Sequence, residues 1–162
     1  MYLWDREMRS LRGELSKIPP AQRLALALKT MDWTLNLMGP VETTEIRNYL
    51  SKGMTQGHED LLAGREKITL PEEMLDAYED LDAVADEPGT SQMLMAILAC
   101  SDAPEGLSGE VLYGVLSFCY EALLDREDIP VYSLEAEVEN ARCAEVIAFQ
   151  KQRVWEAVEN SG

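Results

Sequence analysis

The sequence predicts an all-α protein in which about seven helices pack around a buried, apolar central helix at about residues 107–124. Apolar residues recur at the three- and four-residue spacing of a helix face along most of the chain. Between Glu110 and Glu121 no side chain is charged, and apolar residues occupy nearly every side of a helix. A helix without a polar face is buried. A chain of 162 residues has the length of one domain with a substantial core, so residues 1–162 are expected to form a single helical domain.

The first two predicted helices are separated by a proline pair. A helix over residues 2–17 carries one apolar stripe, and Pro19-Pro20 ends it. A second helix over residues 21–38 has a stripe with the same spacing and stops at Gly39-Pro40. The stripe of the first helix consists of Trp4, Met8, Leu11 and Leu15.

Three more helices are predicted in the middle of the chain. The third begins near residue 44 and gives way to a polar, glycine-rich loop over residues 53–64. The fourth begins at Pro71, with acidic residues in its first turn, and extends to residue 87. The fifth begins near Thr90 and is almost wholly apolar, so it must lie deep in the fold.

The last two predicted helices begin at serine residues. Ser108 caps the central helix, and Ser133 caps a final helix that is expected to run without a break to Asn160. The three tryptophans lie at helical spacing and are expected in or beside the core. Trp4 and Trp155 have an alternative role as exposed anchors for self-association or for a partner, so a monomer and a homodimer are both open.

Cysteine usage and hydropathy indicate a cytoplasmic protein. Each of the three cysteines lies in an apolar helical pattern and is expected to be buried and reduced. The N-terminal residues lack the apolar core of a secretory signal, and we expect no contact with a membrane. The cysteines are Cys100, Cys119 and Cys143.

Acidic residues are concentrated in the second half of the chain. The sequence has 30 Asp plus Glu against 14 Lys plus Arg, a formal net charge of −16. Residues 1–70 carry a net charge of +1, and residues 71–162 carry −17. From Ile68 to Asp125 there is no Lys or Arg, while thirteen acidic residues occur. Nucleic acid is therefore not expected as a direct ligand, because phosphates need a basic surface, and the expected partner is a basic protein.

Two interpretations of these acidic residues are open. Taken singly, they form a solvated face or complement helix dipoles at helix starts. Taken together, the helix at 71–87 and the turns at 102–106 and 125–128 form an acidic surface that binds a basic protein. The residues predicted to bind the partner are Glu72, Glu73, Asp76, Glu79, Asp80, Asp82, Asp86, Glu87, Asp102 and Glu105.

Most known catalytic and metal-binding patterns are missing from the sequence. His58 is the only histidine and is expected to be exposed in the polar loop. One histidine and three scattered cysteines provide neither zinc-ligand spacing nor a catalytic triad. No glycine-rich phosphate loop occurs. We therefore expect no catalytic residue and no cofactor.

One carboxylate pattern resembles an enzyme site. The pairs Glu42-x-x-Glu45 and Glu73-x-x-Asp76 resemble the paired carboxylates with which all-α nucleotide pyrophosphohydrolases hold Mg²⁺. The resemblance implies that the four carboxylates converge on Mg²⁺ from facing helices. The competing interpretation is that these are ordinary acidic residues of first helical turns, and residues 68–125 offer no basic group for a triphosphate.

These observations favour a non-enzymatic, acidic binding protein that occludes a basic protein partner. The most specific hypothesis is a bacterial immunity protein that neutralises a cognate toxin such as a nuclease, because an acidic face can take the place of phosphates. An adaptor or chaperone for a basic client protein is a second hypothesis. A Mg²⁺-dependent all-α nucleotide pyrophosphohydrolase is the third.

Overall fold

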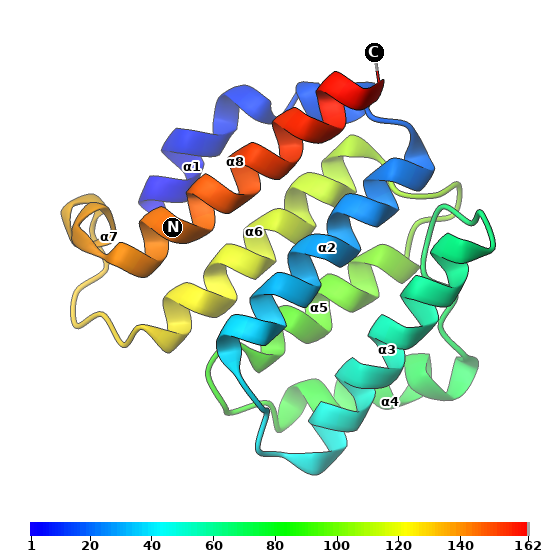
Figure 1. Cartoon of the computed structure of the whole chain (residues 1–162). Coiled ribbons are helices and arrows are strands. Elements are labelled where there is room, and N and C mark those ends of the chain that lie inside the picture. Colours follow the sequence, from blue (N-terminus) through cyan, green and yellow to red (C-terminus); the bar gives the residue numbers. More distant parts are fainter. Residues whose placement is uncertain (162) are drawn as a thin grey trace.

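The computed structural model describes residues 1–161 and over that range confirms the predicted all-α fold. These residues form eight α-helices around one continuous hydrophobic core, and none of them lies in a β-strand (Figure 1). The α-helices are α1 (Tyr2–Met8), α2 (Pro20–Met38), α3 (Thr44–Leu62), α4 (Glu72–Ala83), α5 (Thr90–Ser101), α6 (Gly109–Arg126), α7 (Leu134–Glu139) and α8 (Ala141–Ser161). Two 3-10 helices, η1 (Arg9–Leu11) and η2 (Glu14–Lys17), connect α1 to α2.

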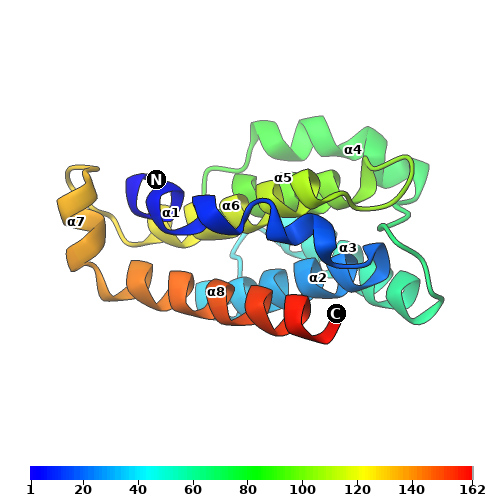
Figure 2. The ribbon, with the colours of Figure 1, turned by 90° about the horizontal axis from the view of Figure 1, so that it is seen from above.

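The predicted central helix is α6. It packs against α2, α5 and α8, and its side chains Leu112, Val115 and Leu116 are fully buried. Ser108 caps it as predicted, because the Ser108 hydroxyl accepts a hydrogen bond from the Val111 N–H at 3.1 Å. Figure 2 shows α4 and α8 on opposite sides of the layer that contains α5 and α6. The outer position of α4 leaves one of its faces in solvent.

The N-terminal segment differs from the single helix that was predicted over residues 2–17. It consists of α1 followed by η1 and η2, but its predicted apolar stripe is buried. The stripe survives because residues three apart lie on one side of a 3-10 helix as well. The Trp4 indole N–H donates to the Gln150 amide oxygen at 2.7 Å, and the Gln150 amide donates to the Leu116 carbonyl at 3.0 Å. These bonds satisfy a fully buried amide and join α1, α8 and α6.

The predicted loop over residues 53–64 is wrong, because α3 continues to Leu62. Its glycines are needed for close helix packing and do not end the helix. A Cβ atom at Gly57 would lie 2.6 Å from the Leu28 side chain, and one at Gly53 would lie 3.0 Å from Ile97. Glycine weakens a helix by about 1 kcal/mol relative to alanine, and here the tight contact of α3 with its neighbours offsets that cost.

The predicted helix over residues 133–160 is also corrected. Ser133 caps α7 by accepting the Ala136 N–H at 3.1 Å, but α7 ends at Glu139. Asn140 has an extended backbone, and its side-chain oxygen accepts the Cys143 N–H at 3.0 Å. This hydrogen bond caps the N-terminus of α8. Asn140 therefore stands both at the end of α7 and at the start of α8.

The connection between α4 and α5 begins earlier than predicted, because α4 ends at Ala83. Asp86 and Glu87 therefore lie outside the helix. The Glu87 carboxylate accepts the Glu42 N–H at 3.1 Å and pairs with Arg126 at 3.5 Å. Gly89, with a φ of +87°, stands at the N-cap of α5, which begins at Thr90. Glycine adopts this left-handed conformation without strain.

The buried carboxylate of Asp60 forms hydrogen bonds that hold the connection between α3 and α4. This fully buried group accepts hydrogen bonds from the Thr69 N–H at 2.7 Å and from the Arg65 guanidinium at 2.6 Å. Burial acts to raise the pKa of Asp60, but the Thr69 N–H, Arg65, the Thr69 hydroxyl and the Gln56 amide together outweigh it. The net effect lowers the pKa below the ordinary value of 3.8, so the folded protein favours the ionised form.

The cysteines are buried as predicted, and burial raises the pKa of the Cys119 thiol to about 12. Such a thiol is a poor nucleophile. Trp4 lies in the core, Trp33 is half-buried and stacks on Phe149, and Trp155 is exposed. None of the helices described here is both long and apolar enough to cross a bilayer.

Candidate interaction surfaces

The outward side of α4 carries five exposed carboxylates and no basic residue. At about 100° per residue, the five positions fall within an arc of about 120°, a third of the helix circumference. The opposite side packs against the core through buried Met74 and half-buried Tyr78 and Leu81. The acidic α4 face, as we define it, consists of Glu72, Glu73, Asp76, Glu79 and Asp80.

The acidic α4 face receives no cation from the rest of the protein. Eight of the 14 Lys and Arg side chains form ion pairs within residues 1–161, and none of these pairs involves α4. Arg12, for example, contacts Glu110 at 2.6 Å and lowers the pKa of that carboxyl, chiefly through their hydrogen bond. The other six form no ion pair within that range, and one of them, Lys52 on α3, lines the groove between α3 and α4 together with Glu73. No ion pair within residues 1–161 therefore compensates the charge on α4.

This uncompensated charge opposes helix formation. Asp76 stands four residues from both Glu72 and Asp80, and like-charge pairs at this spacing each cost about 0.2–0.5 kcal/mol. Asp80 also lies in the last turn, where the helix dipole disfavours negative charge. Binding of a cationic surface would relieve both effects.

Exposed apolar side chains border the acidic α4 face. Leu75 is 43% exposed and lies three residues after Glu72 and four before Glu79, on the adjoining strip of the helix surface. Val84 is 56% exposed just beyond the helix end. Carboxylates beside apolar side chains suit a protein interface, where apolar contact adds affinity to electrostatic attraction.

The other residues predicted to bind a partner have different environments. Asp82 accepts a hydrogen bond from the Ser91 hydroxyl at 2.7 Å, and Glu87 is engaged with Glu42 and Arg126 as described. Asp86 is exposed in the α4–α5 connection, outside the helix. Asp102 and Glu105 follow the end of α5 and are exposed. Glu105 lines a hollow together with Arg65 and Lys67. The structure therefore groups five of the ten residues on one helix face.

The four carboxylates of the Mg²⁺ hypothesis are not assembled into one site. Glu42 precedes α3, which begins at Thr44, so only Glu45 of the first pair lies on a helix, whereas both were predicted to. Glu45 and Glu73 line a groove of about 680 Å³ between α3 and α4, whereas Glu42 and Asp76 do not. Within residues 1–161 no three His, Cys, Asp or Glu side chains are arranged to hold a metal ion.

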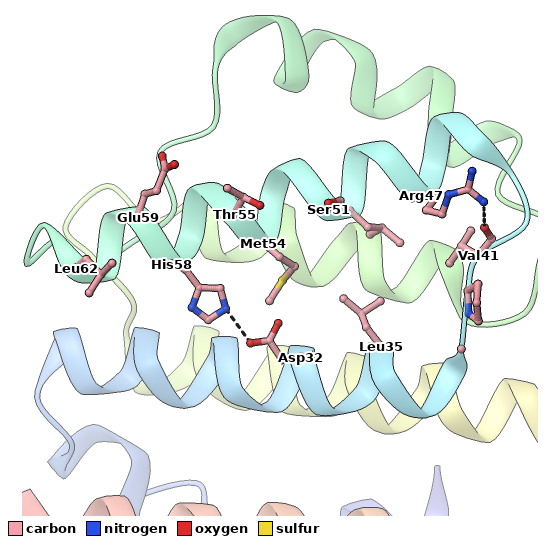
Figure 3. A pocket seen from close by; sticks show the side chains of 13 residues that line it. Asp32, Leu35, Val41, Arg47, Ser51, Met54, Thr55, His58, Glu59 and Leu62 are labelled. Atoms are coloured by element: carbon pink, nitrogen blue, oxygen red, sulfur yellow. Dashed lines mark hydrogen bonds and ion pairs between the residues drawn. The ribbon is translucent and has the colours of Figure 1, made fainter.

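A second groove, of about 560 Å³, runs between α2 and α3 (Figure 3). Its floor is apolar, with Leu35 from α2 and Leu50 and Met54 from α3. His58 lies on α3 at one end, which corrects its predicted place in a loop. Its Nε2 atom is 2.7 Å from an oxygen of Asp32 on α2, and both side chains are about half exposed.

Sequence reasoning missed this groove because it ended the third helix too early. Leu50, Met54, His58 and Leu62 follow one another at four-residue intervals, which is the spacing of one helix face. That stripe runs through the segment assigned to a loop because of its glycines. This four-residue spacing could have predicted that the third helix continues to Leu62, with apolar side chains facing the groove.

No protein-family model, curated protein or solved structure matches this chain, so its own surfaces are the basis for inferring a function.

Proposed function

We propose that this protein is a non-enzymatic binding protein whose acidic α4 face binds and occludes a basic surface of another protein. The observation that carries the proposal is a row of five exposed carboxylates on one 12-residue helix that forms no ion pair within residues 1–161. Lys and Arg of a partner would supply the missing cations. Leu75 at the border of the face would add apolar contact.

Electrostatic attraction is expected to set the rate at which the partner associates and the specificity of binding. Glu72, Asp76 and Asp80 follow at intervals of four residues, so they form a row of about 12 Å along the helix. A concentrated row of one sign attracts a basic surface before contact and disfavours acidic proteins. Affinity should therefore fall as salt is added. At 0.1 M salt, the attraction between exposed charges more than about 10 Å apart is largely screened, and this distance shortens as the salt concentration rises.

A finer form of the proposal is an immunity protein that covers the substrate cleft of a toxin nuclease. Such a cleft is basic because it binds phosphates, and the acidic α4 face offers a competing row of negative charge. An adaptor for a basic client would use the same face. The activity of the bound partner separates the two, since an immunity protein abolishes a nuclease activity and an adaptor leaves it intact.

The test uses the whole protein as bait in extract of the cells that produce it, at low and then high salt. Asp76→Lys with Asp80→Lys should reduce retention of a basic partner at least tenfold. Glu139→Lys with Glu159→Lys is the matched control, because it changes the net charge equally at exposed positions on α7 and α8. Undiminished retention by the α4 variant, or an equal loss in the control, would show that the acidic α4 face is not the interface.

A further inference from the structure

Exposed apolar side chains and a hollow occur together where α1, α7 and α8 meet. Trp155 on α8 is 46% exposed, and Val138 on α7 is 48% exposed. Val138 borders a hollow of about 330 Å³, which we call the α1/α7/α8 hollow. Its wall on α8 includes the small residues Ala144 and Ala148, and its wall on α1 includes Leu3. Figure 1 shows α1 beside α8, with α7 at the end of both.

Trp155 and the α1/α7/α8 hollow lie on the same face of α8. Trp155 follows Ala148 by seven residues and Ala144 by eleven, so at about 100° per residue the three side chains fall within an arc of about 40°. The indole stands about 10–16 Å along the helix from the two alanines. Trp155 cannot fill the hollow of its own chain, because both are fixed on one helix.

A face that carries both an exposed indole and a hollow is complementary to a second copy of itself. When two α8 helices run antiparallel about a two-fold axis, each Trp155 meets Ala144 and Ala148 of the other copy. The axis then crosses α8 midway between the indole and the hollow, at about residues 150–151. A different protein would need only one of the two shapes, whereas a two-fold dimer needs both on one surface.

The charged groups of the α1/α7/α8 hollow suit an aromatic ring. Arg6, Glu7 and Lys151 line it, with a net charge of +1. Lys151 pairs with Glu7 at 3.1 Å, and the Arg6 guanidinium lies 3.5 Å from the other Glu7 oxygen while its side chain is 53% exposed. A cation over the face of a tryptophan is attracted by the π electrons of the ring. Trp155 of a second copy would therefore meet apolar walls and a guanidinium.

This surface carries little of the charge that would repel a second copy. The whole chain has a net charge of −16, but α8 has a net charge of zero and residues 2–17 have +1. Two exposed glutamates of α7, Glu135 and Glu139, stand at one end of the surface. The acidic α4 face lies on the opposite side of the α5 and α6 layer (Figure 2). Exposed charges more than about 10 Å apart are largely screened at 0.1 M salt, so α4 does little to oppose contact through α8.

We propose that the chain forms a two-fold homodimer through antiparallel α8 helices, with Trp155 of each copy inserted into the α1/α7/α8 hollow of the other. The contact is separate from the acidic α4 face and does not depend on the function proposed above. Each copy keeps its α4 face accessible, because α4 and α8 lie on opposite sides of the protein (Figure 2).

Sedimentation equilibrium of the full-length protein, from micromolar to millimolar concentration, tests the proposal. The mass should rise from that of one chain to that of two. Trp155→Ala should raise the dissociation constant at least tenfold, as for loss of a tryptophan anchor. Ala148→Tyr should weaken the dimer as well, because the new ring occupies the hollow. Leu62→Ala is the control, since it removes a side chain that is 90% exposed on α3 and should leave the dissociation constant unchanged.

Cross-linking tests the direction of the two helices. Residue 152 lies beside the expected axis, whereas the two copies of residue 159 stand about 25 Å apart along the helices. Gln152→Cys should therefore form a disulfide between two chains under a mild oxidant, and Glu159→Cys should not. Both positions are exposed, and the native cysteines are buried.

Three results would overturn the proposal. The first is the mass of a single chain at millimolar concentration. The second is a dimer that neither Trp155→Ala nor Ala148→Tyr weakens, with urea melts showing that both variants are folded. The third is equal cross-linking of Gln152→Cys and Glu159→Cys.

Discussion

Reversing one charge on α4 should stabilise the protein. Asp76 is exposed, forms no ion pair within residues 1–161, and stands four residues from both Glu72 and Asp80. Asp76→Lys turns two like-charge pairs into two opposite-charge pairs, and each repulsion lost or attraction gained is worth about 0.2–0.5 kcal/mol. The free energy of unfolding should therefore rise by about 1–2 kcal/mol at low salt. In a chain of this length, that gain raises the melting temperature by about 2–4 °C for each kcal/mol.

Urea denaturation at 20 mM and at 1 M NaCl measures this effect and its origin. The gain should shrink at 1 M salt, where charges more than about 3 Å apart are screened. Asp76→Asn is the control, because it removes the repulsion without adding attraction and should give about half of the gain. Stability that is unchanged or lowered by Asp76→Lys at low salt would refute the reasoning that the carboxylates of α4 repel one another. Under the proposed function, the same variant should bind the basic partner more weakly, since the new cation lies within the proposed interface.

Three further substitutions test the packing, the buried carboxylate and the helix cap. Gly57→Ala should lower the free energy of unfolding by about 1–3 kcal/mol in urea melts, whereas Gly13→Ala, which has open space around it, should be neutral or slightly stabilising. Asp60→Asn should cost about 2–3 kcal/mol at neutral pH. Because the pKa of Asp60 is lowered in the folded state, its contribution is present above about pH 4 and is lost as the pH falls through the lowered value. Acid titration of stability should thus be steeper for the wild type than for Asp60→Asn. Asn140→Ala should cost about 1 kcal/mol by removing the cap of α8, seen as a lower melting temperature, and an unchanged value would contradict the capping role.

Helix periodicity predicted the core because it depends on only local spacing. The stripe of Trp4, Met8, Leu11 and Leu15 is buried even though the segment is not one α-helix. On α4 the same spacing predicts Met74, Leu75, Tyr78 and Leu81 on the inner side, but only in part correctly, because Leu75 is 43% exposed.

Features that depend on distant neighbours could not be predicted. A glycine at position 57 resembles a helix breaker until Leu28 is placed against it. Glu87 resembles its exposed acidic neighbours until Arg126, 39 residues away in sequence, is brought to it. The break at Asn140 depends on a side chain that caps the following helix.

The two flanks of α4 are each fastened to the rest of the protein independently of the helix. On one side Asp60 holds Thr69, and on the other Glu87 is held by Glu42 and Arg126. The carboxylates of α4 repel one another, and both flanks of the helix are held in place. The helix can therefore open locally while the other helices remain folded. Amide hydrogens of α4 should then exchange with solvent through this local opening, faster than those of α6. Substitutions on the outer side of α4 should therefore change the rate of this local opening while leaving the exchange of the α6 amides unchanged.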